Sequence, residues 1–210
     1  MSEAGDIGLD RGTIVAFIQD IFECRGGERY LGEAVTLAEH MLQGATIAER
    51  KGDPEEIVAA ALLHDIGHIV GGSGFFSMND TQDRFHEKAG ARFLEPFFPR
   101  VVVDCCRLHV AAKRYLCAIE PGYFDTLSAA SVHSLTLQGG PMNAEEAAQF
   151  ETQPSFHEII AVRYLDDAGK RVGMATPEFA HFVPMLQRMV DARSRDGSAE
   201  QDRIIHADRA

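Results

Sequence analysis

The sequence predicts an all-α protein in which a single helical domain spans residues 1–193. Apolar residues recur at helical spacing, as they do between Thr13 and Phe22, and residues that start or stop helices separate the apolar segments. No convincing run of alternating apolar and polar residues indicates a strand. The 210 residues, 45% of them apolar, are enough to bury one sizeable core. Residues 194–210 are polar and are expected to form a mobile tail.

Helical periodicity divides the chain into a series of predicted helices. In chain order they span Thr13–Phe22, Tyr30–Arg50, Asp53–His68, Phe85–Phe93, Val101–Leu116, Thr126–Leu137, a short segment from Asn143, Phe156–Ala168 and Thr176–Arg193. Glycine ends several of them, at residues 26–27, 52, 71–74 and 139–140. Two of the starts carry capping signals. Residues 53–56 supply a capping Asp, a proline and a Glu, and residues 143–146 repeat the capping box.

Composition and charge exclude several classes of protein. The net charge of −12 argues against a nucleic-acid-binding face, although a few local cations are enough to bind an anionic substrate. No apolar run is long enough to span a membrane, and residues 1–6 lack the features of a signal peptide. The chain has four cysteines, Cys24, Cys105, Cys106 and Cys117, and they show no CxxC spacing. We therefore expect reduced thiols and a cytoplasmic protein.

One short stretch carries the strongest chemical signal. The alanine- and leucine-rich helix over residues 59–68 brings His64, Asp65 and His68 to its C-terminal end. An unpaired carboxylate is very costly to bury, and a metal ion supplies the compensation directly. Imidazole combined with carboxylate suits Fe, Mn or Zn. The stretch therefore predicts a metal site.

Further candidate ligands lie on separate predicted helices: His40, His86, His109 and the pair Asp166-Asp167. A lone helical histidine is more often a core or surface residue than a ligand, and an Asp pair at a helix end is usually solvated. The ordered set indicates more, because helix bundles build dimetal centres from inward-pointing His and carboxylate side chains. Periodicity alone does not choose between Asp166 and Asp167. Glu39 precedes His40 in the sequence. Its side chain could either support that histidine or lie in solvent, and the sequence does not choose between the two.

This order of His, His-Asp, His, His and Asp resembles the HD-domain superfamily, specifically its dinuclear branch. Simple HD phosphohydrolases lack the counterparts of His86 and His109, which would hold a second metal. Residues 30–33 (Tyr-Leu-Gly-Glu), Lys113 and residues 163–167 resemble a narrower group. These are the mixed-valent di-iron oxygenases that cleave the C–P bond of 1-hydroxy-2-aminoethylphosphonates, relatives of myo-inositol oxygenase. The resemblance covers about residues 27–170.

The resemblance implies two iron ions, Fe(II) and Fe(III), with O2 as co-substrate. The first iron would be bound by His40, His64, Asp65 and Asp166. Asp65 would bridge to the second iron, which His86 and His109 would complete. Open positions at the second iron would then remain for substrate and oxygen. The family pattern favours Asp166 over Asp167 as the last ligand.

The same resemblance implies roles around the metals. His68 and Lys113 would meet the phosphonate charge and act with Asp65 in catalysis, and Lys113 shares a helix face with His109. Ser131 matches a phosphonate-contacting serine. Tyr30 and Glu33 would hold the ammonium end of the substrate, because an aromatic ring and a carboxylate both attract a cation.

The implied reaction oxygenates C1 of the substrate and releases phosphate. The organic product would be glycine, or glycine betaine if the nitrogen is trimethylated, and overall resemblance favours the trimethylated substrate. A separate hydroxylase would supply the 1-hydroxy compound.

Several alternatives share part of this pattern. A metal-dependent phosphohydrolase acting on a phosphate ester would use similar ligands and cations. The cyclic-dinucleotide HD hydrolases carry Gly-Tyr-Pro, from which residues 122–124 (Gly-Tyr-Phe) depart. His64 and His68 have the spacing of a zincin, but Asp65 stands where a glutamate base is needed. The glycine stretch at 71–74 lacks the Lys-Ser/Thr of a P-loop, which indicates a turn or a lid.

Overall fold

The computed structural model describes residues 8–27, 32–71 and 78–193, and this part of the chain is helical, without a strand. The helices are α1 (Ile14–Arg25), α2 (Leu37–Lys51), α3 (Glu55–Leu63), α4 (Gly67–Val70), α5 (His86–Leu94), α6 (Arg100–Ile119), α7 (Tyr123–Thr126), α8 (Ala129–Leu137), α9 (Ala144–Phe150), α10 (Phe156–Ala168) and the 3-10 helix η1 (Phe179–His181). Residues 183–193 form a further helix. The predicted all-α fold is confirmed.

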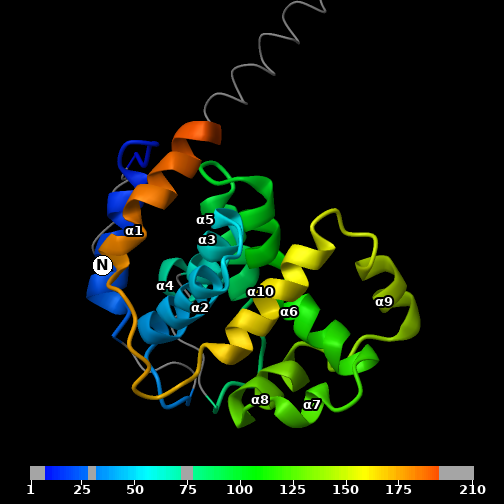
Figure 1. Cartoon of the computed structure of the whole chain (residues 1–210). Helices are drawn as coiled ribbons and strands as arrows, with labels where there is room; N and C mark the ends of the chain where they lie inside the picture. Colours follow the sequence, from blue (N-terminus) through cyan, green and yellow to red (C-terminus); the bar gives the residue numbers. More distant parts are fainter. Residues whose placement is uncertain (1–7, 28–31, 72–77, 194–210) are drawn as a thin grey trace, which may run out of the picture.

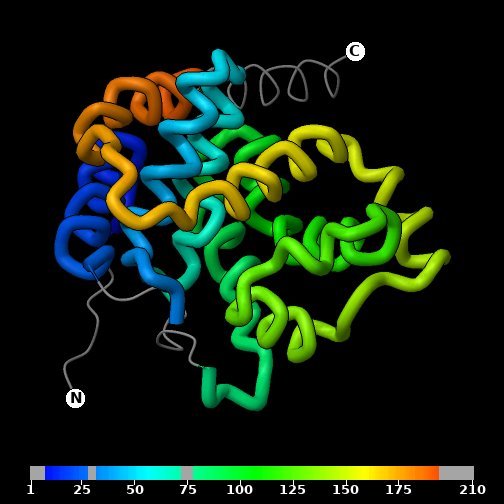
Figure 2. Tube along the Cα trace, turned by 60° about the horizontal axis from the view of Figure 1, so that its bottom comes forward, coloured from blue at the N-terminus to red at the C-terminus, as the bar shows by residue number. Residues whose placement is uncertain are grey.

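Helices α2, α3, α6 and α10 form the centre of the bundle. Helix α2 packs on α3 and α10, α6 packs on both of the same helices, and α5 lies against α4 and α6. Helix α1 and the helix of residues 183–193 lie side by side on one flank, whereas α7, α8 and α9 occupy the other (Figures 1 and 2). None of the helices described is long and apolar enough to cross a membrane.

Helix α3 runs through the core. Every residue from Ile57 to Leu63 is buried, because a helix that is apolar on all sides finds no face to expose to water. The turn that follows carries His64 and Asp65, which are both 1% exposed. The apolar helix therefore delivers these polar side chains to the interior of the bundle.

Two predicted helix starts were wrong by several residues, and the predicted Asp53 cap was wrong as well, because Pro54 is the N-cap of α3 and no side-chain hydrogen bond caps this helix. The helix expected from Tyr30 begins at Leu37 instead, because the Thr36 hydroxyl accepts a hydrogen bond from the Glu39 N–H while the Glu39 carboxylate accepts one from the Thr36 N–H. The Glu39 carboxylate therefore caps the N-terminus of α2, a role that differs from both of those considered for it from the sequence. The helix expected from Thr176 begins only at η1, since residues 174–178 are irregular.

Two other predicted helices are each divided. The segment expected to run to His68 breaks after Leu63, and α4 resumes at Gly67. The segment expected from Thr126 is split between α7 and α8, with the Ser128 hydroxyl capping α8. The tail predicted at residues 194–210, and most of the predicted glycine turn at 71–74, lie outside the described residues. The domain boundary at residue 193 stays a prediction.

Gly67 allows α4 to approach α5 closely. A Cβ atom built at this position would lie 1.9 Å from the His86 carbonyl oxygen. No side chain could be accommodated at that distance without a shift of the backbone. Gly67→Ala should therefore destabilise the fold by about 3 kcal/mol or more, measurable by thermal unfolding. Gly27→Ala is the control, because a Cβ there meets nothing within 4 Å. Equal melting temperatures for the two variants would contradict the expected clash.

Candidate metal centre

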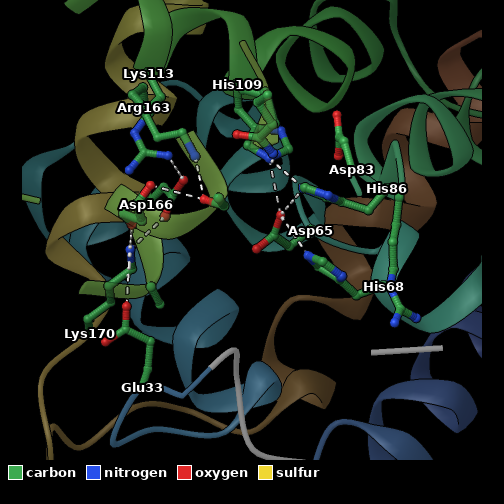
Figure 3. A pocket seen from close by; sticks show the side chains of 16 residues that line it. Glu33, Asp65, His68, Asp83, His86, His109, Lys113, Arg163, Asp166 and Lys170 are labelled. Atoms are coloured by element: carbon green, nitrogen blue, oxygen red, sulfur yellow. Dashed lines mark hydrogen bonds and ion pairs between the residues drawn. The ribbon is translucent and has the colours of Figure 1, made fainter. Parts of the chain in front are cut away.

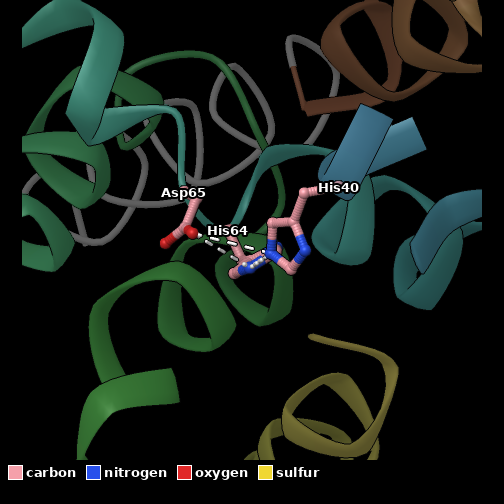
Figure 4. Close-up of side chains that lie close together, drawn as sticks. All are labelled: His40, His64 and Asp65. Carbon is pink, nitrogen blue, oxygen red and sulfur yellow. Dashed lines mark hydrogen bonds and ion pairs between the residues drawn. The ribbon is translucent and has the colours of Figure 1, made fainter. Parts of the chain in front are cut away.

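The two oxygens of Asp65 face two different pairs of histidines. Oδ2 lies 3.7 Å from His40 Nε2 and 3.5 Å from His64 Nε2. Oδ1 lies 3.2 Å from the Nε2 atoms of both His86 and His109. One carboxylate in the turn after α3 therefore joins two groups of potential ligands (Figures 3 and 4).

The first group, here called the Asp166 cluster, consists of His40, His64 and Asp166 around Asp65 Oδ2. The two histidine Nε2 atoms are 3.1 Å apart. Asp166, near the end of α10, places Oδ1 3.5 Å from His40 Nε2 and Oδ2 3.8 Å from His64 Nε2. Each of these side chains is at most 3% exposed.

The hydrogen bonds of this cluster show why it fits a cation. His40 Nδ1 donates to the Gly169 carbonyl at 3.1 Å, and His64 Nδ1 donates to the Ala61 carbonyl at 2.9 Å. In the neutral rings the Nε2 lone pairs then point toward one another and toward the carboxylates of Asp65 and Asp166. Lone pairs converging at this range repel, and a cation between them converts that repulsion into attraction.

Burial lowers the pKa of His40 to about 3, against the opposing charge of Asp166. Its ring is therefore neutral near pH 7, which is the form that binds a metal. For Asp65, burial would raise the pKa, but the charge of His64 and hydrogen bonds from His109 and His86 hold it well below its usual range. Asp65 therefore offers an ionised carboxylate.

The second group, here called the His86 cluster, consists of His86 and His109 around Asp65 Oδ1. Their Nε2 atoms are 3.1 Å apart, and His109 Nδ1 donates to the Cys106 carbonyl at 2.8 Å. Burial lowers the pKa of His109. Burial also opposes charging of His86, but its hydrogen bond to Asp65 and the carboxylate charges of Asp65 and Glu87 raise its pKa.

His68 lies against the His86 cluster. Its ring stacks on that of His86 at a centroid distance of 4.0 Å and an interplanar angle of 15°. Its Nε2 is 4.0 Å from Asp65 Oδ1, farther than the 3.2 Å of His109. The ligand atoms of Asp65, His68 and His86 still lie within 4.8 Å of one another. His68 is thus close enough to face a ligand or substrate held at this cluster.

The residues present fit a pair of borderline divalent or trivalent metals. Three imidazoles whose protons are directed to backbone carbonyls, a fourth imidazole and two carboxylates converge in the interior, and this donor set suits Fe, Mn or Zn. The Asp166 cluster offers four protein groups when Asp65 is counted. The His86 cluster offers only three, which leaves room for exogenous ligands.

A pocket beside the His86 cluster is lined by cations as well as by carboxylates. Lys113, Arg163 and Lys170 all line it (Figure 3). Lys113 Nζ, 3% exposed, donates to Ser134 Oγ at 2.7 Å. Burial and the neighbouring Arg163 lower the pKa of Lys113 to about 7. The pocket can therefore receive an anion next to the metal ligands.

The residues predicted to contact substrate are placed as follows. Ser131 lines the pocket, and its Oγ accepts a hydrogen bond from Lys170 Nζ at 3.0 Å. Glu33 also lines it, accepts a hydrogen bond from Ser128 Oγ and lies 3.8 Å from Lys170 Nζ. Tyr30 lies outside the described residues.

Three cations of the pocket received no role from the sequence, Arg84, Arg163 and Lys170, and the last two contact Asp166. Arg163 Nη1 donates to Asp166 Oδ2 at 2.5 Å, and Lys170 Nζ lies 3.7 Å from Asp166 Oδ1. They stand three residues before and four residues after Asp166, a helical spacing that brings both near it, although α10 ends at Ala168 and Lys170 lies just beyond its end. That spacing is the signal that could have found them.

Comparisons with known proteins define first the class and then the family. Residues 37–115 match the model of the HD domain. The chain is 65% identical over 191 residues to the [1-hydroxy-2-(trimethylamino)ethyl]phosphonate dioxygenase (glycine-betaine-forming) of Leisingera caerulea, covering 91% of this chain and 97% of that protein. It is 40% identical over 162 residues to a hydroxymethylphosphonate dioxygenase of Gimesia maris, covering 74% and 78%. The chain belongs to the HD-domain oxygenases that act on phosphonates.

Proposed function

We propose that this protein is an O2-dependent oxygenase that cleaves the C–P bond of 1-hydroxy-2-(trimethylammonio)ethylphosphonate to give glycine betaine and phosphate. The activity for which the Leisingera caerulea relative, 65% identical, is named supports this substrate. The amino analogue, which would give glycine, is the second candidate substrate. The reaction balances with one O2 per turnover, since both oxygen atoms enter the products as C1 becomes a carboxylate and phosphorus becomes phosphate.

The position of Asp65, whose two oxygens face different histidine pairs, is the single observation of the structure that carries the proposal. We propose that the residues around it would hold two iron ions, one Fe(II) and one Fe(III), which would supply the redox chemistry of O2 activation. The proposed ligands are His40, His64, Asp166, His86 and His109, together with Asp65 itself. Support comes from the convergence of their side-chain nitrogen and oxygen atoms on Asp65 in the interior of the bundle.

The surrounding side chains provide binding and orientation. Lys113 and Ser131 line the pocket and suit the phosphonate, a tetrahedral anion with three oxygen acceptors. His68, stacked on His86, is placed to donate to or accept from a group held at the His86 cluster. Glu33 attracts the ammonium end, and Tyr30 is proposed to join it through its ring face.

The main alternative is a phosphohydrolase acting on a phosphate ester. The two relatives named as phosphonate dioxygenases favour the oxygenase, because their names specify oxygen as a reactant and phosphonate as the substrate. The buried cations alone do not separate the two activities. We also propose that a separate hydroxylase supplies the 1-hydroxy substrate, since the bound hydroxyl at C1 is a starting requirement of the reaction. The cytoplasmic location expected from the cysteines belongs to the same proposal.

The test combines metal analysis with product analysis. Protein prepared anaerobically is loaded with iron and supplied with the trimethylammonio or the amino substrate, and O2 uptake and phosphate release are measured together. We expect about two irons per chain, one O2 consumed per phosphate, and faster turnover of the trimethylammonio compound. Phosphate release from an ester substrate without O2 uptake would overturn the proposal, as would full activity in metal-free protein.

The pH dependence of turnover should report Lys113. Its pKa of about 7 means that the free enzyme carries the Lys113 charge below pH 7 and loses it as the pH rises above that value. We expect kcat/KM to fall by up to about tenfold per pH unit above pH 7 in the wild type. In Lys113→Arg this decline should be absent, because a guanidinium stays charged. The substrate titrates identically in both proteins, so equal profiles would contradict the role of Lys113.

A further inference from the structure

We propose that Tyr123 is a positioning residue of the metal centre, acting through Asp167 and Arg163 on the ligand Asp166. Tyr123 is the first residue of α7, which lies at the flank of the bundle (Figure 1), and its hydroxyl contacts Asp167 and Arg163. It belongs to the Gly-Tyr-Phe stretch for which the sequence suggested no role. The inference rests on the proposed metal site, and its test separates the two.

A continuous set of hydrogen bonds leads from Tyr123 to the centre. The Tyr123 hydroxyl donates to Asp167 Oδ2 at 2.5 Å and accepts from Arg163 Nε at 2.9 Å. Arg163 Nε also lies 3.1 Å from Asp167 Oδ2, and its Nη2 donates to Asp167 Oδ1. The other end of the guanidinium, Nη1, donates to Asp166 Oδ2 at 2.5 Å.

The guanidinium can transmit position because it is planar and rigid. One edge of Arg163 is held by Asp167 and Tyr123, so the direction of Nη1 toward Asp166 is determined. Arg163 is 3% exposed and Tyr123 4% exposed, so little water competes for these contacts. With Oδ2 held by Arg163, Asp166 presents Oδ1 toward His40 Nε2, 3.5 Å away.

The arrangement also sets the charge that Asp166 can offer a metal. A carboxylate paired with an arginine of its own is largely neutralised and is a weaker ligand. Here the single positive charge of Arg163 is shared between Asp166 and Asp167. Tyr123 strengthens the pairing of Arg163 with Asp167, because its hydroxyl contacts both side chains. Its loss should weaken the hold of Asp167 on Arg163, although the direct contacts between the two remain, and should let the guanidinium move closer to Asp166 and compete with the metal.

The chain offers a matched control in Tyr164. Its hydroxyl also donates to a carboxylate, that of Glu120, and its ring lies 6.2 Å from that of Tyr123 in an edge-on arrangement. Tyr164 is 43% exposed, and its hydrogen bond leads away from the cluster. Tyr164→Phe therefore removes the same chemical group from the same neighbourhood without breaking the path to Asp166.

The experiment measures Co2+ binding to metal-free protein, since Co2+ substitutes for Fe(II) in His and carboxylate sites and is followed by its absorption. It is carried out in a His86→Ala background, so that the Asp166 cluster is observed alone. Tyr123→Phe should raise the Kd for Co2+ about three- to tenfold, because it removes two hydrogen bonds that act on the metal ligand only through Asp167 and Arg163. Asp167→Asn should raise it about 10- to 100-fold, as partners of metal ligands typically do. Tyr164→Phe should leave it unchanged.

The outcomes are distinguishable. If the parent protein binds no Co2+, the proposed metal site fails, and the inference fails with it. If the parent binds and Tyr123→Phe binds equally well, only the inference is overturned. Thermal unfolding of the metal-free proteins distinguishes a positioning role of Tyr123 from a merely structural one. A lower melting temperature of Tyr123→Phe with an unchanged Kd for Co2+ would also overturn the inference. Should Tyr123→Phe not fold, Asp167→Asn decides alone, because the Asp167 side chain is 23% exposed and its loss breaks the same path.

Discussion

Replacement of Asp65 by asparagine is expected to abolish metal binding at both clusters and to reduce phosphate release to the level of metal-free protein. The physical reason is that Oδ1 and Oδ2 of Asp65 face different histidine pairs, so one substitution removes an anionic ligand from each. Loss of a partner of a metal ligand typically costs 10- to 100-fold in affinity or activity, and loss of a shared ligand should cost more than about 100-fold.

The measurement is iron content per chain together with kcat/KM for phosphate release. Asp104→Asn is the control, because Asp104 is equally a buried carboxylate, 5% exposed, but pairs with Arg100 at 3.1 Å outside the site. The fold of Asp65→Asn should survive, since the substitution preserves volume and removes a buried charge. Two irons bound to Asp65→Asn with normal turnover would show that Asp65 does not bridge.

Replacement of His86 by alanine is expected to remove the second metal and to lower turnover at least about 100-fold, while the first metal stays bound. His86 belongs to the cluster that offers only three protein groups, so its removal leaves one histidine and the shared carboxylate. The Asp166 cluster keeps all of its groups. Metal analysis should therefore find about one metal per chain instead of two.

His181→Ala is the matched control for this variant. His181 also contacts a carboxylate, Glu49 at 2.8 Å, but it is exposed and lies outside both clusters. Circular dichroism and thermal unfolding should show that both variants remain folded, because His86 is the first residue of α5 and α5 packs mainly through other residues. Full activity of His86→Ala with unchanged metal content would remove His86 from the site.

The helices were predictable wherever the signal was local. The capping box at Asn143 is present, with Asn143 Oδ1 accepting from the N–H groups of Glu145 and Glu146. The helix from Phe156 to Ala168 has the predicted bounds. Thr36 and Glu39 form an equivalent capping box, which lies inside the longer apolar pattern that predicts a start at Tyr30. Local capping contacts decided that boundary against periodicity.

The break after α3 had a different cause. The apolar pattern continues beyond Leu63, so periodicity predicted an unbroken helix to His68. In the structure the chain turns at His64 to Ile66, and the His64 and Asp65 side chains both reach the interior, where they contact each other and His40. Close packing of Gly67 on the His86 carbonyl accompanies the turn. Contacts with α2, α5 and α6, all distant in sequence, outweigh the local preference for helix.

The choice between Asp166 and Asp167 shows the same limit within the site. Neighbouring residues on a helix differ in direction by roughly 100°, so only one of the two can face the bundle axis. Asp166 faces His40 and His64, whereas Asp167 faces Arg163 and Tyr123. The sequence contained both carboxylates but not the rotation of α10 about its own axis.

By itself the sequence determined the helical class, the donor chemistry and the order of the candidate ligands, because residue type and spacing are local properties of the chain. Only the tertiary structure decided which lone pairs converge, that the two oxygens of Asp65 serve different clusters, and that Arg163 and Lys170 join the pocket. These facts depend on how α2, α3, α5, α6 and α10 are rotated and packed. That packing is set by the burial of apolar surface between segments far apart in the sequence.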